Sequence, residues 1–222
     1  ASILKHTAGG FLDLNFGLPG VWWCAVACGD YDNDGRADFF LAGQKGDGTR
    51  IADVWHNTGA GFTNLNLGLP QLGDACAAWG DYDNDGWLDL LVCGETTTDQ
   101  VSQVWHNTGT GFTNLNANLN GVRHGDAAWG DYDNDGKLDI LLENLVFRNT
   151  GYGFVRTLEM PMPYYTASAW GDYDNDGRLD IVFSSDAYFT RTYVFHNNTP
   201  RTNTPPLPPA NLSAVVTGAA AT

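Results

Sequence analysis

Basic residues are scarce in this sequence of 222 residues. Only 11 Lys and Arg stand against 26 Asp and Glu, which gives a formal net charge of -15. A surface with that excess of negative charge repels phosphate backbones and anionic lipid headgroups. Nucleic acid is therefore not an expected partner.

Long apolar runs are missing as well. No stretch approaches the roughly 18 continuous apolar residues that a membrane-spanning helix requires. The chain opens with Ala1-Ser2-Ile3 rather than with a charged segment followed by an apolar one. We therefore expect a soluble chain without membrane insertion, with any export signal outside this sequence. A hydrophobic content of 43% and 13% aromatics indicate a folded protein with a core.

Paired C-x-x-C spacing is absent too, so the cysteines do not indicate a zinc site. The four cysteines are Cys24, Cys28, Cys76 and Cys93. A disulfide such as Cys76 to Cys93 is possible, but four cysteines permit three complete pairings, and the sequence leaves the pairing open.

What the sequence does contain is an internal repeat. The heptapeptide Gly-Asp-Tyr-Asp-Asn-Asp-Gly begins at Gly29, Gly80, Gly130 and Gly171, at spacings of 51, 50 and 41 residues. A second motif, Trp-His-Asn-Thr-Gly in its fullest form, follows each copy with details that drift. Self-similarity with a period of this length indicates a repeat architecture.

Each unit predicts four antiparallel strands. The first is a small, apolar run before the heptapeptide, such as 75–79, and the second is a run after it with apolar residues on both faces, such as 88–92. The third ends at the aromatic-His pair, and a tight Asn-Thr-Gly-x-Gly turn leads into the fourth. Such a unit makes one β-propeller blade. In the third unit a surface loop is shortened between strands two and three.

The two ends of the chain do not coincide with unit boundaries. A shift of 51 positions aligns Gly10-Phe11 with Gly61-Phe62, so the chain is expected to begin at the third strand of a unit. The fold class expected for residues 1–198 is all-β: a β-propeller of four-stranded antiparallel blades in a partial or open ring, with four loop repeats and an N-terminal half blade. The proline-rich segment 199–209 predicts a stiff linker, and 210–222 resembles the start of a fibronectin type III domain. Open sheet edges predict contacts with other copies or with the rest of a longer chain.

The heptapeptide opens the pattern D-x-D-x-D-G-x-x-D, which indicates a metal site. Alternate carboxylates converge on one point when the backbone curls, and the glycine at the sixth position allows the sharp turn. Hard oxygen donors without nitrogen or sulfur select calcium, so we predict four Ca²⁺ sites. The predicted carboxylate ligands are Asp30, Asp32, Asp34, Asp38, Asp81, Asp83, Asp85, Asp89, Asp131, Asp133, Asp135, Asp139, Asp172, Asp174, Asp176 and Asp180. The predicted main-chain carbonyl ligands are those of Arg36, Trp87, Lys137 and Arg178.

An EF-hand loop is the alternative interpretation of this pattern. It needs Glu at position twelve and flanking helices, whereas position twelve is Leu41, Val92, Leu142 or Phe183 and the flanks read as strands. The loop between two strands, the length of the repeat and the Asn-x-Gly-x-Gly-Phe turn together resemble FG-GAP/VCBS repeats. This resemblance implies a calcium-binding propeller of the integrin type, an extracellular or cell-surface location, and a role in binding or adhesion, without naming one function.

Other recurring residues predict structural roles. His56, His106 and His196 occupy one repeated position beside an aromatic, which predicts packing or hydrogen bonding. Trp79, Trp129 and Trp170 precede the loops, and Tyr31, Tyr82, Tyr132 and Tyr173 lie within them, which predicts packing between blades.

The positions seven and eight before each loop vary, and we expect them on the face opposite the acidic loops. Candidate ligand-binding residues among them are Trp22, Trp23, Arg123, His124, Tyr164 and Tyr165. Aromatics with an adjacent Arg and His suit a sugar ring or an extended peptide. The alternative is that they only seal gaps between blades.

The sequence contains no nucleophile elbow, phosphate loop or zinc helix, and its repeated carboxylates are expected to be metal ligands. We therefore predict that the chain is not an enzyme. The main hypothesis is a secreted, calcium-binding module for recognition or adhesion, with a glycan or protein ligand. The alternatives are a structural assembly module of a surface or filament protein, and an accessory domain of a carbohydrate-active enzyme.

Overall fold

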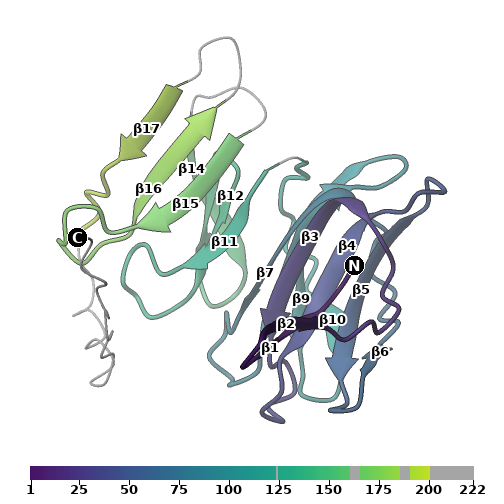
Figure 1. Ribbon diagram of the computed structural model, residues 1–222. Helices are drawn as coiled ribbons and strands as arrows, with labels where there is room; N and C mark the ends of the chain where they lie inside the picture. The colour runs from purple at the N-terminus through teal and green to yellow at the C-terminus, as the bar shows by residue number, and fades with distance from the viewer. Residues whose placement is uncertain (124, 161–165, 186–190, 201–222) are drawn as a thin grey trace, which may run out of the picture.

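The computed structural model describes residues 1–123, 125–160, 166–185 and 191–200. These residues form strands β1 to β17 and no helix, and every paired strand is antiparallel to its neighbour (Figure 1). Within the described part of the chain, no helix is long and apolar enough to cross a membrane. The all-β antiparallel fold predicted from the sequence is confirmed, and the helices that an EF-hand requires are absent from these ranges.

The strands form an N-terminal hairpin and four sheets, which follow one another along the chain. The hairpin pairs β1 (Leu4–Thr7) with β2 (Gly10–Asp13). Sheet I contains β3 (Trp22–Gly29), β4 (Asp38–Gln44), β5 (Arg50–Asn57) and β6 (Phe62–Asn64). Sheet II contains β7 (Gly73–Gly80), β8 (Asp89–Glu95), β9 (Gln100–Asn107) and β10 (Phe112–Asn114).

Sheet III contains β11 (Ala127–Gly130), β12 (Asp139–Leu142), β13 (Leu145–Asn149) and β14 (Phe154–Glu159). Sheet IV contains β15 (Thr166–Gly171), β16 (Asp180–Ser185) and β17 (Arg191–Phe195). Each sheet is a meander in which every strand pairs with the next one along the chain. The hairpin has the position in the repeat of strands three and four, as predicted.

The second strand of each four-stranded sheet is buried on both faces. In β8 the residues from Asp89 to Gly94 are all buried, and β4 is buried in the same way. This pattern arises because the sheets stack face to face, so that β4 and β5 pack against the next sheet through Phe40, Val54 and Leu90. Equivalent apolar clusters lie between sheets II and III and between sheets III and IV.

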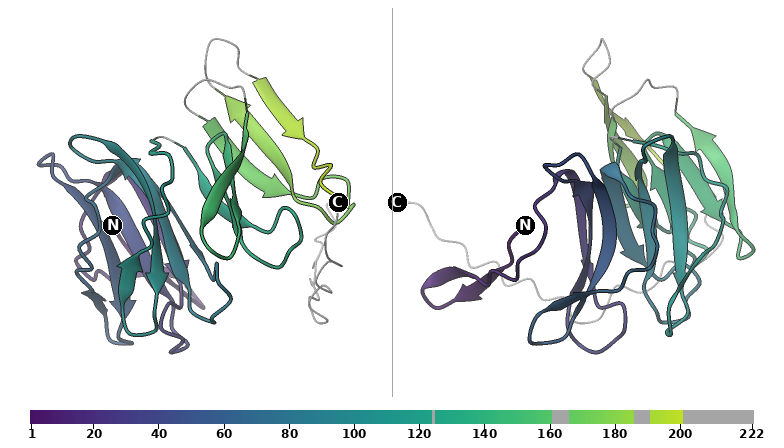
Figure 2. Two further views of the ribbon diagram at one scale, coloured as in Figure 1. Left: turned by 180° about the vertical axis from the view of Figure 1, so that it is seen from behind. Right: turned by 90° about the vertical axis from the view of Figure 1, so that its right-hand side faces the viewer.

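The first strands of successive sheets contact one another, β3 with β7, β7 with β11 and β11 with β15. The described sheets form an open row in which the N-terminal hairpin projects away from sheet I (Figure 2). Sheet IV stands at the other end of the row (Figure 1). The described part of the chain does not close into a ring. The predicted linker 199–209 and the domain start 210–222 lie almost wholly outside the described residues.

A disulfide joins Cys76 of β7 to Cys93 of β8, which face each other across the strand pair. The disulfide between Cys76 and Cys93 that the sequence left open is therefore present. Cys24 and Cys28 of β3 are free and exposed.

Candidate calcium site

An acidic loop connects the first and second strands of each sheet, and we number the loops 1 to 4 after sheets I to IV. Their residues are Asp30–Asp38, Asp81–Asp89, Asp131–Asp139 and Asp172–Asp180. Each loop lies between two strands, as the sequence predicted.

The first Asp of each loop curls the backbone by accepting two main-chain hydrogen bonds. In loop 2, Asp81 Oδ1 accepts from Asp85 N at 3.0 Å and Asp81 Oδ2 accepts from Gly86 N at 2.9 Å. The same pair of bonds recurs in the other three loops. The curl needs left-handed backbone at Asn84 (φ 60°) and Gly86 (φ 91°), which explains why asparagine and glycine recur at these positions.

The last Asp of each loop is fully or almost fully buried where the second strand begins. Asp89 Oδ1 accepts a hydrogen bond from Asn107 N at 2.8 Å, and Asp89 Oδ2 accepts one from Tyr82 N at 3.1 Å. Burial raises the pKa of Asp89 to about 6 and that of Asp139 to about 7, against these hydrogen bonds. A cation beside the loop would favour the charged carboxylate.

Carboxylate oxygens converge within the loops. One ligand atom each from Asp81, Asp83 and Asp89 lies within 4.8 Å of the others, and Asp30, Asp32 and Asp38 form the same group in loop 1. This acidic cluster can hold a metal ion, and its carboxylate oxygens suit a hard cation such as calcium. The predicted carbonyl ligand at the seventh position remains a prediction. The main-chain nitrogen of that residue donates within the loop, as from Arg36 N to Asp34 Oδ1 at 2.8 Å.

The recurring histidines lie against the loops of their own sheets. His106 Nδ1 is 3.4 Å from Asp83 Oδ2 and 3.1 Å from Asp89 Oδ1. His56 and His196 occupy equivalent places beside loops 1 and 4. His106 makes a hydrogen bond to the acidic loop, a contact that was not predicted from the sequence. Each of these histidines also lies with two loop aspartates in a group that could hold a metal ion, so the structural role predicted for them stays a prediction. The recurrence of His directly before the last Asn of the third strand was the available signal.

Loop 3 differs from the other loops because Arg148 replaces the histidine. Arg148 Nε lies 2.6 Å from Asp133 Oδ2, and a terminal nitrogen of Arg148 lies 3.2 Å from Asp135 Oδ2. Lys137 also pairs with Asp135, with its Nζ 3.0 Å from Asp135 Oδ2. Although burial favours the neutral form, Lys137 and Arg148 hold the pKa of Asp135 below its usual value.

The residue at position seven adds another difference between the loops. Arg36 pairs with Asp34 in loop 1, and Arg178 pairs with Asp176 in loop 4. In loop 2 this residue is Trp87, and its four aspartates have no Lys or Arg ion pair within the described part of the chain. Loop 2 therefore carries the least compensated negative charge of the four.

Asparagines link successive loops into one row. Asn33 Nδ2 donates to Gly86 O at 3.0 Å, and Asn84 and Asn134 repeat this bond to the next loop. At the end of the third strand, Asn107 Nδ2 donates to Tyr31 O of the preceding loop at 2.8 Å. This role was not predicted from the sequence because the bonds join residues 43 to 76 positions apart.

Of the candidate ligand residues, Trp22 and Trp23 lie at the end of β3 away from loop 1. Trp22 and Trp23 stack with ring centroids 5.1 Å apart and are 54% and 59% exposed on sheet I, the first sheet of the row. Arg123 lines a pocket between sheets II and III. His124, Tyr164 and Tyr165 lie outside the described residues.

Comparison with curated proteins gives no match. Among solved structures, a lectin from Agrocybe aegerita, described for specific recognition of non-reducing terminal N-acetylglucosamine, is 22% identical with a TM-score of 0.49. The alignment covers 79% of this chain and 49% of the lectin. The biofilm matrix protein Bap1 of V. cholerae is 19% identical with a TM-score of 0.47, over 82% of this chain and 30% of Bap1. The chain thus spans at most about half the length of these structures.

The model of the FG-GAP-like repeat family matches residues 30–92 and 81–142. The two matches overlap and together span just over half of the 222 residues. Each match starts at the first Asp of an acidic loop and ends in the second strand of the next sheet. The chain belongs to the family of FG-GAP-like repeat proteins.

Proposed function

We propose that this chain is a calcium-binding, extracellular β-propeller module that recognises a glycan. The observation that supports the calcium component is the repeated convergence of carboxylate oxygens in the acidic loops. In this proposal each loop holds one Ca²⁺ through its aspartates and the carbonyl at position seven. Each sheet then corresponds to one blade of a propeller.

A calcium titration of the chelator-treated protein tests this component. The expected result is uptake of four ions, with the tightest binding at loop 2. Asp81→Ala should remove one of the four ions and leave three. The proposal is overturned if calorimetry detects no uptake, or if Asp81→Ala leaves the number of bound ions unchanged.

The recognition component rests on the pocket between sheets II and III, at the end of the strands away from the acidic loops. Its volume is about 370 Å³, which falls within the range of small-ligand sites. The turn between β12 and β13 consists of only Glu143 and Asn144, whereas the corresponding turn of sheet II spans 96–99. The short turn exposes the side of sheet II and leaves room for the pocket.

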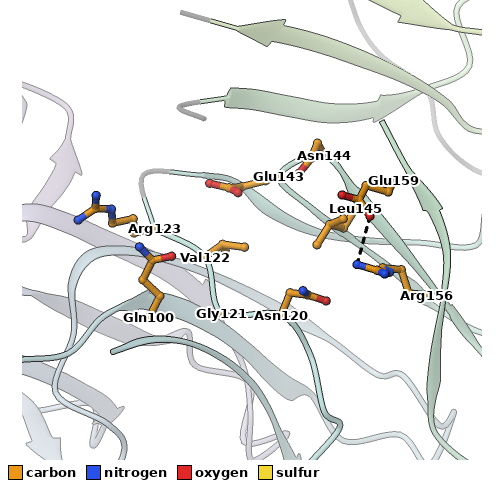
Figure 3. Close-up of a pocket in the computed structure, with 10 residues that line it drawn as sticks. All are labelled: Gln100, Asn120, Gly121, Val122, Arg123, Glu143, Asn144, Leu145, Arg156 and Glu159. Atoms are coloured by element: carbon orange, nitrogen blue, oxygen red, sulfur yellow. Dashed lines mark ion pairs between the residues drawn. The ribbon is translucent and has the colours of Figure 1, made fainter. Parts of the chain in front are cut away.

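The lining of this pocket suits a neutral ligand with many hydroxyl groups. Gln100, Arg123 and Glu143 approach from one side, and Arg156 and Glu159 from the other (Figure 3). The two arginines and two glutamates balance in charge. Arg156 and Glu159 pair at 3.2 Å, while no partner is recorded for the Glu143 carboxylate within the described residues. Donors and acceptors around an apolar floor can satisfy sugar hydroxyls that both donate and accept.

Binding of the calcium-loaded protein to an array of neutral glycans tests the recognition component. Arg156→Ala should weaken binding to the best glycan at least about tenfold, the loss expected for one charged hydrogen bond. Tyr152→Ala is the matched control, since Tyr152 is fully exposed in the turn near loop 3. Binding that is absent, or unaffected by Arg156→Ala, would contradict a glycan site here.

The extracellular location is supported by the disulfide between Cys76 and Cys93, since such bonds persist in oxidising compartments. We further propose that the chain is not an enzyme. The absence of catalytic motifs from its sequence supports this proposal, and an accessory role beside a catalytic domain is compatible with it. The alternative of an assembly module depends on the faces that sheets I and IV leave exposed.

A further inference from the structure

Three tryptophans form the same contact between successive sheets. Trp79 of sheet II stacks on Tyr31 of loop 1 with ring centroids 6.3 Å apart, and its Nε1 donates to Ala27 O at 3.1 Å. Trp129 stacks on Tyr82 at 6.1 Å. Trp170 stacks on Tyr132, also at 6.1 Å. Sheets I to III therefore each receive an indole from the sheet that follows.

A glycine at the end of the first strand makes room for each of these indoles. A Cβ atom added to Gly80 would lie 2.6 Å from Trp129 Cδ1, and one added to Gly130 would lie 2.7 Å from Trp170 Cδ1. At Gly29 the nearest Trp79 atom would be 3.0 Å away. The glycine and the loop tyrosine together form an indole socket, with one socket on each of sheets I to III.

Sheet IV carries the same socket without an indole. A Cβ atom added to Gly171 would have no neighbouring atom within 4 Å among the described residues, and Tyr173 is 56% exposed. The ring contact recorded for Tyr173 in the described part of the chain is with His196 of its own sheet. The parts that receive the indole are thus present in sheet IV and open to solvent.

The apolar face beside this socket is exposed in the same way. Leu141 and Val146, on the receiving face of sheet III, are 0% and 2% exposed beneath sheet IV. The equivalent residues of sheet IV, Val182 and Val194, are 38% and 52% exposed. Exposed apolar surface at positions that are buried in three sibling sheets indicates an interface without its partner.

The hydrogen-bonding groups beside the socket also have partners on the next sheet in sheets I to III. Asn33, Asn84 and Asn134 each donate to a glycine carbonyl of the next loop. Asn175, the fourth of this series, has no such bond among the described residues. The loop tyrosines of sheets I to III likewise accept, through their main-chain carbonyls, hydrogen bonds from the Asn at the end of the third strand of the next sheet.

We infer that the exposed face of sheet IV docks a further FG-GAP-like repeat sheet that carries Trp directly before its acidic loop. Such a partner supplies the indole, the apolar second strand, the glycine carbonyl and the asparagine amide together. The interface continues the one that already joins sheets I to IV.

The first sheet of a second copy does not meet this description. Its residue at the tryptophan position is Cys28, so it has no indole for the socket. The partner is therefore a repeat sheet that carries Trp at this position, and not the first sheet of a second copy.

This inference can be tested by photo-crosslinking in the full-length protein, expressed in its native organism. p-Benzoylphenylalanine at Tyr173 should crosslink to a peptide that contains Trp-Gly-Asp and lies outside residues 1–222. The same probe at Tyr82 is the positive control and should reach Ala127–Gly130. Gly171→Ala should cut the Tyr173 crosslink at least fivefold, because the new Cβ blocks the indole.

The same substitution distinguishes an empty socket from a filled one in this chain alone. Gly130→Ala should lower the melting temperature by roughly 5 °C through overpacking against Trp170, whereas Gly171→Ala should leave it unchanged. A crosslink from Tyr173 to residues 201–222, to Trp22–Gly29 of another copy, or to nothing while the Tyr82 control succeeds would overturn the inference. An unfavourable effect of Gly171→Ala equal to that of Gly130→Ala would also overturn it.

Discussion

Sheets II and III have the same strand order and the same acidic loop, yet different interactions stabilise them. In sheet II the Cys76–Cys93 disulfide joins β7 to β8, and the aspartates of loop 2 have His106 as their basic neighbour. In sheet III the positions of the two cysteines hold Asp126 and Glu143, which meet through a main-chain hydrogen bond of 2.9 Å. Arg148 and Lys137 pair with the aspartates of loop 3.

This comparison separates what the repeat needs from what each copy adds. Both loops keep the first and last aspartates with their main-chain hydrogen bonds, so these bonds belong to the fold of the loop. The basic side chains that pair with the other loop carboxylates differ between the two sheets. Within the described residues, loop 2 has no Lys or Arg ion pair, whereas loop 3 pairs with Arg148 and Lys137.

Removal of calcium should have the largest effect on this comparison. At a calcium concentration 100-fold above Kd, each occupied site adds about 2.7 kcal/mol to the free energy of unfolding, so chelation should lower stability by several kcal/mol. Hydrogen exchange should report a greater loss of protection in 81–89 than in 131–139, because Arg148 and Lys137 remain in loop 3. Equal losses in the two loops, or an unchanged melting curve, would contradict the comparison.

Substitution of the first aspartate is expected to have the next largest effect. Asp81→Ala removes two hydrogen bonds to a charged acceptor and one calcium ion, and should lower the free energy of unfolding in calcium by about 4 kcal/mol. Asp131→Ala, the matched variant in loop 3, should cost less, since it loses a more weakly held ion. Denaturant titrations in calcium and in chelator measure both. The difference between the variants should vanish in chelator, and its persistence there would refute this explanation.

The disulfide gives sheet II a further source of stability. Cys76 and Cys93 are 17 residues apart in the sequence, and a cross-link across such a loop typically contributes about 3 kcal/mol. The Cys76→Ser, Cys93→Ser double variant should lose this amount in denaturant titrations. The Cys24→Ser, Cys28→Ser double variant is the control and should stay within about 0.5 kcal/mol, because both side chains are exposed. A loss of the same size in the control would argue against a specific role of the disulfide.

The order of strands and the acidic loops could be predicted from the sequence because both depend on local chemistry. Alternating aspartates with glycine at position six specify the loop, and a repeat that recurs four times specifies the sheets. Contacts between sheets could not be predicted in this way. The bond from Asn107 to Tyr31 and the indole socket at Gly80 depend on the distance between stacked sheets, which no single unit encodes. The Arg148 substitution was visible as drift in the second motif, but its contact with loop 3 followed only from the pairing of β12 and β13.

Exchange of Arg148 in sheet III and His106 in sheet II should give the smallest effect, a change in the calcium affinity of one loop at a time. The Arg148 guanidinium competes with calcium for Asp133 and Asp135, and it keeps its charge at neutral pH. Because Arg148 is partly exposed, solvent screens the competition, and we expect Arg148→His to tighten calcium binding at loop 3 about tenfold, equivalent to about 1.4 kcal/mol. His106→Arg is the reciprocal variant and should weaken loop 2 by a similar factor. Calcium titrations followed by NMR signals of each loop measure the two sites separately. If both substitutions shifted affinity in the same direction, or neither did, the basic residue beside the loop would not be what distinguishes the two sheets.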